Sequence, residues 1–168
     1  MKSDLFWVPA RWRGKLAVAA RPRGGDWLEE EASGWRRKWL DVVVSLLEAQ
    51  EAAELELTHE REFVDSDGLR FISFPIPDRG VPASVSAAVS LLRVVTEALE
   101  NGKNVAIHCR QGIGRSGLIA AGVLVMSGVP VDQALDMVSA ARGQTVPETP
   151  AQIQWIRYLT SELPVATT

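Results

Sequence analysis

The only cysteine of the chain, Cys109, stands between two apolar segments of different length. The segment before it, 104–108 (NVAIH), is short and rich in branched residues, which is typical of a buried strand. The segment that begins seven residues after it, 116–126 (SGLIAAGVLVM), has the length of a buried helix. The pattern predicts a strand, a tight loop and a helix, with the thiol at the mouth of the loop.

Glycines and arginines fill the predicted loop in the order Cys-Arg-Gln-Gly-Ile-Gly-Arg. Gly112 and Gly114 remove side chains where the backbone has to curl, so successive N–H groups can turn inward and form an anion nest. The start of the following helix adds its partial positive charge. We therefore expect a phosphate to be bound by the loop residues Arg110, Gln111, Gly112, Ile113, Gly114 and Arg115.

Three side chains around this loop have a chemical role in the prediction. The loop amides, the helix dipole and the Arg115 guanidinium all favour a negative charge, so we expect Cys109 to be a nucleophilic thiolate at neutral pH. The planar fork of Arg115 can clamp two phosphate oxygens in a way that lysine cannot. Ser116 can donate its hydroxyl to the sulfur, and His108 is interpreted as a buried strut that orients the loop.

The string His-Cys-Arg-Gln-Gly-Ile-Gly-Arg-Ser resembles the HCxxGxxR[S/T] signature of cysteine-dependent protein tyrosine and dual-specificity phosphatases, and it contains every fixed position. The resemblance implies that Cys109 forms a phosphocysteine, Arg115 binds phosphate and the transition state, and Ser116 stabilises the thiolate. It strictly covers residues 108–117 and extends more weakly over 69–163. The stretch 74–78 (FPIPD) looks like the compact dual-specificity group, near the kinase-associated phosphatase type.

The leaving oxygen needs a proton, and Asp78 in Phe-Pro-Ile-Pro-Asp-Arg-Gly is the candidate general acid. Its two prolines and glycine mark a loop after a predicted strand, and the resembling family places its acid in such a loop. Pro-Asp-x-Gly is also an ordinary turn in which Asp accepts a local backbone bond. Asp65 and Asp67 are rivals, but they precede the same strand and should project from its opposite end.

Water must then hydrolyse the thiophosphate, and by resemblance Gln152 is the first choice to position that water, with Gln154 in reserve. A structural role competes for Gln152, because Thr149, Pro150 and Gln152 also fit the start of a helix with a T-x-x-Q capping box. The two displacements need no metal or other cofactor. They require a thiolate and a protonated Asp together, so activity should be bell-shaped in pH with an optimum at roughly 5 to 6.5.

Composition narrows the remaining classes of function. The chain has 168 residues and 46% hydrophobic content, enough for one phosphatase domain over residues 1–168 with a real core. A net charge of -3 gives no support for nucleic-acid binding. We find no charged-then-apolar leader and no apolar run long enough to span a bilayer, and a lone cysteine fits a reducing compartment. We expect a cytoplasmic protein, without a membrane partner, that acts on a phosphorylated protein or peptide; its oligomeric state is open.

The elements that must position the loop alternate along the chain. Predicted strands are Leu5–Val8, Leu16–Ala20, Val42–Leu46, Leu69–Phe74 and Val105–His108. Predicted helices are Asp26–Leu40 with Asp26 as N-cap, Gln50–Glu56, Ser84–Glu100, Ser116–Met126, Asp132–Ala141 and Pro150–Leu163. This order predicts an α/β fold: a mostly parallel sheet of about five strands with helices on both faces and the phosphate loop (P-loop) between the last strand and the next helix. Most tryptophans, including Trp35 and Trp39 one helical turn apart, should be core anchors.

Two other classes of function stay open at this point. One is a module that binds phosphate with weak or no turnover, as would follow if Asp78 did not reach the site. The other is a phosphatase for phosphoinositides or another anion, such as a triphosphatase or an arsenate-handling enzyme. Inositol-specific members of the resembling superfamily often have lysines in the loop, where this chain has Gln111 and Ile113. Phosphoprotein, with phosphotyrosine first and phosphoserine or phosphothreonine also open, is the favoured substrate.

Overall fold

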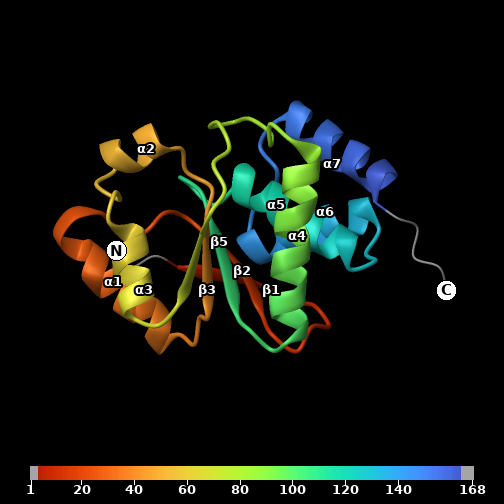
Figure 1. Cartoon of the computed structure of the whole chain (residues 1–168). Coiled ribbons are helices and arrows are strands. Elements are labelled where there is room, and N and C mark those ends of the chain that lie inside the picture. The colour runs from red at the N-terminus through yellow and green to blue at the C-terminus, as the bar shows by residue number, and fades with distance from the viewer. Residues whose placement is uncertain (1–3, 164–168) are drawn as a thin grey trace.

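The computed structural model describes residues 4–163, which form one five-stranded sheet between two layers of helices (Figure 1). The strands are β1 (Leu5–Val8), β2 (Leu16–Ala19), β3 (Val42–Ser45), β4 (Arg70–Ser73) and β5 (Val105–His108). They lie in the order β1-β2-β5-β3-β4, and only the β1–β2 pair is antiparallel. The predicted α/β class and the five predicted strands are confirmed, with ends that differ by no more than one residue.

The central place of β5 puts the P-loop between its neighbours. His108 pairs with Ala19 of β2 on one side and with Ser45 of β3 on the other. Because these strands are parallel, all three end at the same edge of the sheet, and the segments that follow β2 and β3 flank the loop that follows β5. Residues far apart in sequence are thereby brought to one place.

Alternate residues of the central strands fill two separate cores. Val18, Val44 and Ile107 face a large core on one side, and Ala17, Val43 and Ala106 face a smaller one on the other. Both faces of β2, β3 and β5 are therefore buried, which explains why these strands are apolar runs rather than alternating patterns.

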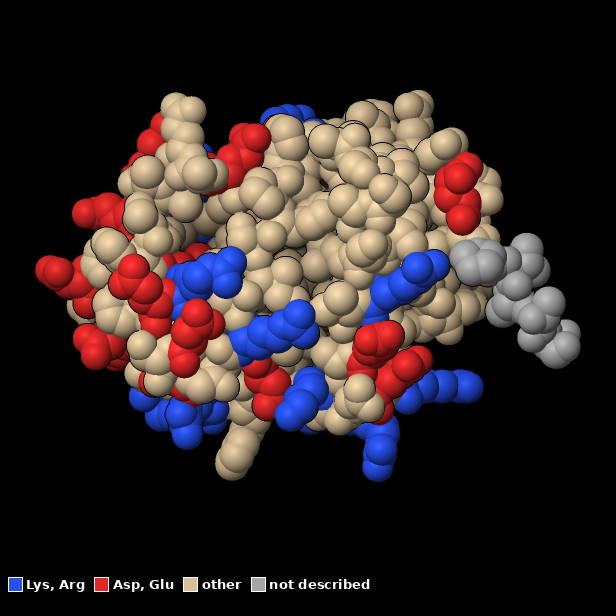
Figure 2. Space-filling model, in the orientation of Figure 1, with Lys and Arg blue, Asp and Glu red and all other residues tan. Residues whose placement is uncertain are grey.

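Helices cover both faces, and the two layers are of different character. One layer contains the short 3₁₀ turn Gly25–Trp27 and the helices α1 (Leu28–Arg37), α2 (Ala49–Glu54) and α3 (Glu60–Ser66). Figure 2 shows acidic side chains gathered on the side of the molecule where these helices lie. The segment 26–62, which covers most of these elements, holds eleven carboxylates, of which Glu31, Glu51 and Glu60 are buried. The other layer contains α4 (Val85–Glu100), α5 (Arg115–Met126), α6 (Val131–Arg142) and α7 (Pro150–Glu162).

Helix α5 lies at the centre of the second layer, in contact with β2, β5, α4, α6 and α7. It is surrounded by protein, and all its residues from Arg115 to Val125 are buried. This position explains an apolar sequence with little amphipathic pattern. It also fixes the start of the helix, where Arg115 and Ser116 are placed, against the end of β5.

Three predictions about this fold were wrong. Asp26 does not cap α1, because the 3₁₀ turn intervenes and Trp27 occupies the cap position without a side-chain bond. Helix α3 was missed, since its polar sequence has no clear apolar period. Most tryptophans are not core anchors: Trp35 and Trp155 are buried, whereas Trp7, Trp27 and Trp39 are 37%, 54% and 80% exposed. For Trp39 the reason is local, because α1 ends before it and its φ of 66° takes the chain out of the helix. The i, i+4 spacing from Trp35 aligns two side chains only while the helix continues.

Among residues 4–163, no helix has both the length and the apolar character that crossing a membrane requires.

Candidate active site

Cys109 is the first residue after β5, and it lies at the base of a small polar cavity. Its side chain is buried, with 3% of the residue exposed, and its Sγ lies 3.3 Å from the Oγ of Ser116 in the first turn of α5. The cavity has a volume of about 170 Å³ and is lined by Asp78, Arg79, Cys109, Arg110, Gln111, Gly114, Arg115 and Glu148. The predicted nucleophile and its hydroxyl partner are therefore adjacent.

The loop backbone needs glycine at Gly112, whereas Gly114 is only closely packed against side chains. Gly112 has a φ of +73°, and a Cβ there would lie 2.6 to 2.7 Å from the backbone of Ala19 and Ala20. A Cβ on Gly114 would lie 3.0 Å from a carboxylate oxygen of Glu148. Helix α5 follows directly, and Gly114 at its N-cap provides no side-chain bond, so the N–H groups of the first turn are free to face an anion.

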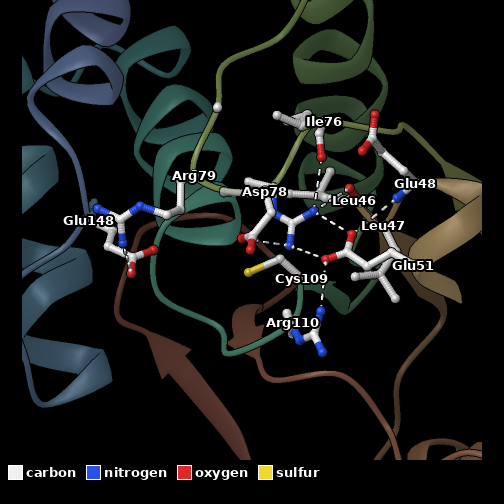
Figure 3. A network of polar contacts seen from close by, with 12 residues as sticks. Leu46, Leu47, Glu48, Glu51, Ile76, Asp78, Arg79, Cys109, Arg110 and Glu148 are labelled. Carbon is white, nitrogen blue, oxygen red and sulfur yellow. Dashed lines mark hydrogen bonds and ion pairs between the residues drawn. The ribbon is translucent and has the colours of Figure 1, made fainter. Parts of the chain in front are cut away.

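Arg115 is held by a set of acceptors that the sequence did not reveal. Its Nη1 and Nη2 each donate to one oxygen of Glu51 at 2.8 Å, which makes a bidentate pair, and Nη1 also donates to the Ile76 carbonyl at 2.9 Å. Glu51 comes from α2, the helix that follows β3, and both residues are buried. Figure 3 shows Glu51, Asp78 and Cys109 gathered in this network. The edge of the guanidinium formed by Nη1 and Nη2 is thus hydrogen-bonded to groups of the protein itself.

The pair changes the acidity of both partners. Burial alone would lower the pKa of Arg115, but the bond to Glu51 and the charges of Cys109, Glu51 and Asp78 outweigh it and raise that pKa. The pKa of Glu51 is lowered from its ordinary value of 4.5, chiefly by the hydrogen bond from Arg115 and against the effect of burial. Both groups are therefore charged at neutral pH, so the guanidinium stays a cation inside the protein.

Asp78 reaches the site from the loop after β4. Its Oδ1 accepts a hydrogen bond from Arg115 Nη2 at 3.2 Å, while its side chain remains 57% exposed (Figure 3). The rivals lie elsewhere, as expected: Asp65 is on α3, and Asp67 accepts from Ser33 at 3.1 Å, before β4 begins. Asp78 is thus the only one of the three that lines the cavity, at a place from which it could act on a leaving group.

Arg79 and Glu148 form an ion pair in the lining of the cavity, next to Asp78. Arg79 Nη1 donates to Glu148 Oε1 at 2.9 Å, which connects the Asp78 loop to the segment before α7 (Figure 3). Neither residue was singled out in the sequence, because a charged pair between distant loops leaves no local pattern. Glu148 thus lines this cavity at a position that only the fold defines.

Gln152 is buried and joins three segments. Its side-chain oxygen accepts from the backbone N–H of Glu148 at 3.0 Å and of Thr149 at 3.1 Å, and its amide nitrogen donates to the Gly80 carbonyl at 3.0 Å. The capping box with Thr149 is confirmed. Both acceptor sites of the side-chain oxygen are thus in use. Gln154, the reserve choice, is exposed and does not line the cavity.

His108 is a buried strut, as predicted, and its partner is a carboxylate. Its Nε2 lies 2.6 Å from Glu60 Oε1, and its ring stacks on Trp35 at a centroid distance of 6.1 Å. His108 and Glu60 are 1% and 3% exposed. The residue that precedes the nucleophile is therefore fixed from α1 and α3, on the far side of the sheet from α5. No group of three or more His, Cys, Asp or Glu among residues 4–163 is arranged to hold a metal ion.

Residues 19–129, which include the Asp78 loop and the whole P-loop, match a family model described as "Polymorphic toxin system, DSP-PTPase phosphatase". The chain belongs to this phosphatase family. The match covers about two thirds of the sequence, from the last residue of β2 to residue 129 after α5, so it extends well beyond the nine-residue signature.

Relatives of this DSP-PTPase extend the match. The chain is 38% identical over 97 residues to protein tyrosine phosphatase domain-containing protein 1 of Mus musculus. The aligned region covers 57% of this chain and 13% of that protein. The chain thus spans only a small part of that relative. The structure of Tk-PTP in its active form has a TM-score of 0.76 and 29% identity, over 95% of this chain and 97% of that one.

The fold of this DSP-PTPase has a second solved counterpart. A kinase-associated phosphatase, with a serine substituted for its catalytic-site cysteine, superimposes with a TM-score of 0.89 over 100% of this chain and 99% of that chain. The identity is 18%, so this match concerns the fold alone. It confirms the predicted likeness to the compact, kinase-associated type at the level of architecture.

Proposed function

We propose that this DSP-PTPase hydrolyses phosphate monoesters of protein side chains, phosphotyrosine first, through a phosphocysteine intermediate. The observation that carries the proposal is the convergence of Cys109, Arg115 and Asp78 on one cavity of about 170 Å³ beside the N-terminus of a buried helix. Ser116 contacts the Cys109 sulfur from that helix. The two displacements require a nucleophile, a hydrogen-bond donor to the thiolate, a phosphate-binding guanidinium and a general acid. Cys109, Ser116, Arg115 and Asp78 have these roles in that order. The names of the relatives, which include tyrosine phosphatases, favour phosphoprotein as the substrate.

In the first step, Cys109 Sγ attacks phosphorus, the S–P bond forms and the ester P–O bond breaks as Asp78 gives its proton to the leaving oxygen. In the second step, water attacks phosphorus, the S–P bond breaks and Asp78 takes the proton of that water. Ser116, 3.3 Å from Sγ, stabilises the thiolate at rest and when it leaves. Arg115 and the loop amides bind the three non-bridging oxygens in both steps.

The contacts of Arg115 define how the phosphate would be bound. Glu51 occupies the end of the fork formed by Nη1 and Nη2, and the hydrogen bonds described for this guanidinium leave Nε–H unused. A phosphate that takes Nε–H and Nη2–H together has to displace Asp78 from Nη2. In this scheme substrate binding itself releases the acid toward the leaving oxygen.

The hydrogen bonds of Gln152 favour a structural role over water positioning. Its amide already bonds two backbone N–H groups and the Gly80 carbonyl, so we assign it first to holding the Asp78 loop against α7.

We also propose that residues 1–168 form a single domain. The chemistry requires its lone cysteine to stay reduced, which a cytoplasmic location would provide.

The test compares wild type with Cys109→Ser, Asp78→Ala and the control Asp65→Ala, an exposed Asp on α3. Substrates are p-nitrophenyl phosphate, phenyl phosphate and a phosphotyrosine peptide. Cys109→Ser should abolish turnover. Asp78→Ala should lower kcat by about a hundredfold or more, and by a larger factor for phenyl phosphate, whose leaving group needs the proton more. Asp65→Ala should match wild type.

Each alternative predicts a different result. Full turnover by Cys109→Ser would refute the mechanism. A wild type that binds vanadate without turnover would support a phosphate-binding module, and preferential hydrolysis of phosphoinositide vesicles over the phosphotyrosine peptide would move the substrate to lipid. An equal loss for both aryl phosphates in Asp78→Ala would remove the acid assignment from Asp78.

A further inference from the structure

Arg142, in the last turn of α6, forms hydrogen bonds to the backbone of the P-loop. Its Nε donates to the carbonyl of Gly112 at 3.0 Å, and its Nη2 donates to the carbonyl of Gln111 at 3.2 Å. Its guanidinium carbon lies 4.2 Å from the centroid of the Phe6 ring in β1. The contacts described for this partly buried cation are thus two peptide oxygens and an aromatic face, and none is a carboxylate.

These bonds determine which way the loop amides point. The carbonyl of Arg110 also faces outward, where it accepts from the backbone N–H of Arg21 at 3.3 Å. In a trans peptide the C=O of one residue and the N–H of the next point in opposite directions. With the carbonyls of Arg110, Gln111 and Gly112 bound on the outer side, the three N–H groups that follow them point toward the inner side of the loop. Arg142 holds two of these three peptides.

We propose that Arg142 is a positioning residue for catalysis, which orients the peptides of the P-loop so that their N–H groups converge on the bound oxyanion. The inference rests on the proposed function, and Arg142 itself does not line the cavity. Its charge lies at the negative ends of two peptide dipoles, so it favours the orientation in which their positive ends face the substrate. Gly112, whose φ of +73° is a conformation that glycine adopts readily, is one of the two residues whose carbonyls Arg142 binds.

Lysine could not replace this arginine. The two carbonyls belong to consecutive residues, and a planar fork with donors at Nε and Nη2 meets both at once. The guanidinium carbon also lies over the Phe6 ring, a contact that a planar guanidinium makes across its face and a compact ammonium does not. Arg142→Lys therefore keeps the charge and removes the orientation, and this makes it the informative substitution.

The experiment measures the dissociation constant of inorganic tungstate by calorimetry for wild type, Arg142→Lys and Arg142→Met. The amide proton shifts of Gly112 and Ile113 are followed in the same titration. Loss of one charge-assisted hydrogen bond predicts about tenfold weaker binding for Arg142→Lys, more for Arg142→Met, and a parallel fall in kcat/KM. The tungstate-induced shifts of the two amides should shrink in both variants. The control is Arg157→Lys, an exposed arginine on α7 paired with Asp132, which should bind tungstate like wild type.

The outcomes separate this inference from the proposed function. If folded Arg142→Lys binds tungstate with wild-type affinity and unchanged amide shifts, the inference is overturned, even when the melting temperature falls. If Arg142→Met does not fold, Arg142→Lys decides alone. A wild type that neither binds tungstate nor turns over phosphate esters would overturn the proposed function and the inference with it, whereas normal activity in wild type and variants alike would overturn only the inference.

Discussion

Replacing Glu51 by Gln tests whether the catalytic arginine depends on a residue that lies 64 positions away in sequence. The carboxylate receives two bonds of 2.8 Å from Arg115, which is 2% exposed. Removing one partner of a buried ion pair leaves the other charge uncompensated and costs about 3 kcal/mol or more. For a domain of this size that corresponds to a fall in Tm of roughly 6 to 12 °C. A misplaced Arg115 should also lower kcat/KM by about a hundredfold.

The pH dependence of this effect has a defined sign. Folding lowers the pKa of Glu51 from its ordinary value of 4.5, so the pair stabilises the folded state at pH values above 4.5. That stabilisation is lost as the pH falls through the lower pKa of the folded state. The difference in unfolding free energy between wild type and Glu51→Gln should therefore be full at pH 7 and should narrow steadily in acid.

The assay is urea unfolding at a series of pH values from 7 to below 4.5, combined with p-nitrophenyl phosphate kinetics at neutral pH. The control is Glu54→Gln on the same helix, an exposed carboxylate whose described partner is Gln50, and it should change neither quantity. A stability difference for Glu51→Gln that is constant with pH would refute the electrostatic argument. Wild-type kcat/KM in Glu51→Gln would show that Arg115 is positioned without it.

Two further substitutions have matched controls in the chain. Gly112→Ala places a Cβ 2.6 Å from backbone at a φ of +73° and should reduce both Tm and tungstate affinity. The control Gly143→Ala has a φ of +82° and nothing within 4 Å of its Cβ, so it should lower Tm less and leave tungstate affinity unchanged. Equal effects of the two substitutions would contradict the close-contact argument. Glu60→Gln weakens the buried contact to His108 and should lower the unfolding free energy by about 1 to 3 kcal/mol in urea titrations. Glu62→Gln, in the exposed pair with His59, should leave the unfolding free energy within about 0.5 kcal/mol of wild type. A larger loss for Glu62→Gln than for Glu60→Gln would refute the role of burial.

The sequence by itself determined the nucleophile loop and the elements on either side of it. Cys109 and Ser116 are seven residues apart, and the loop between them has glycine at position 112, where the positive φ and the nearby backbone admit only glycine, so the relevant constraints are local. The apolar runs on both sides are explained by their burial within the sheet and within α5. The position of Asp78 followed from strand polarity, because a loop after a parallel strand opens at the same edge as the P-loop.

Only the tertiary structure decided what holds these groups in place. Glu51, Glu60 and Arg142 are separated by tens of residues from the groups they bind, and each is one of many charged residues whose sequence surroundings look like a solvated helix face. Trp39 shows the converse, since helical spacing placed it in the core and an early helix end exposed it. Periodicity records which face of an element is buried, but the partner of a buried charge depends on how the elements pack, and that is a property of the whole chain.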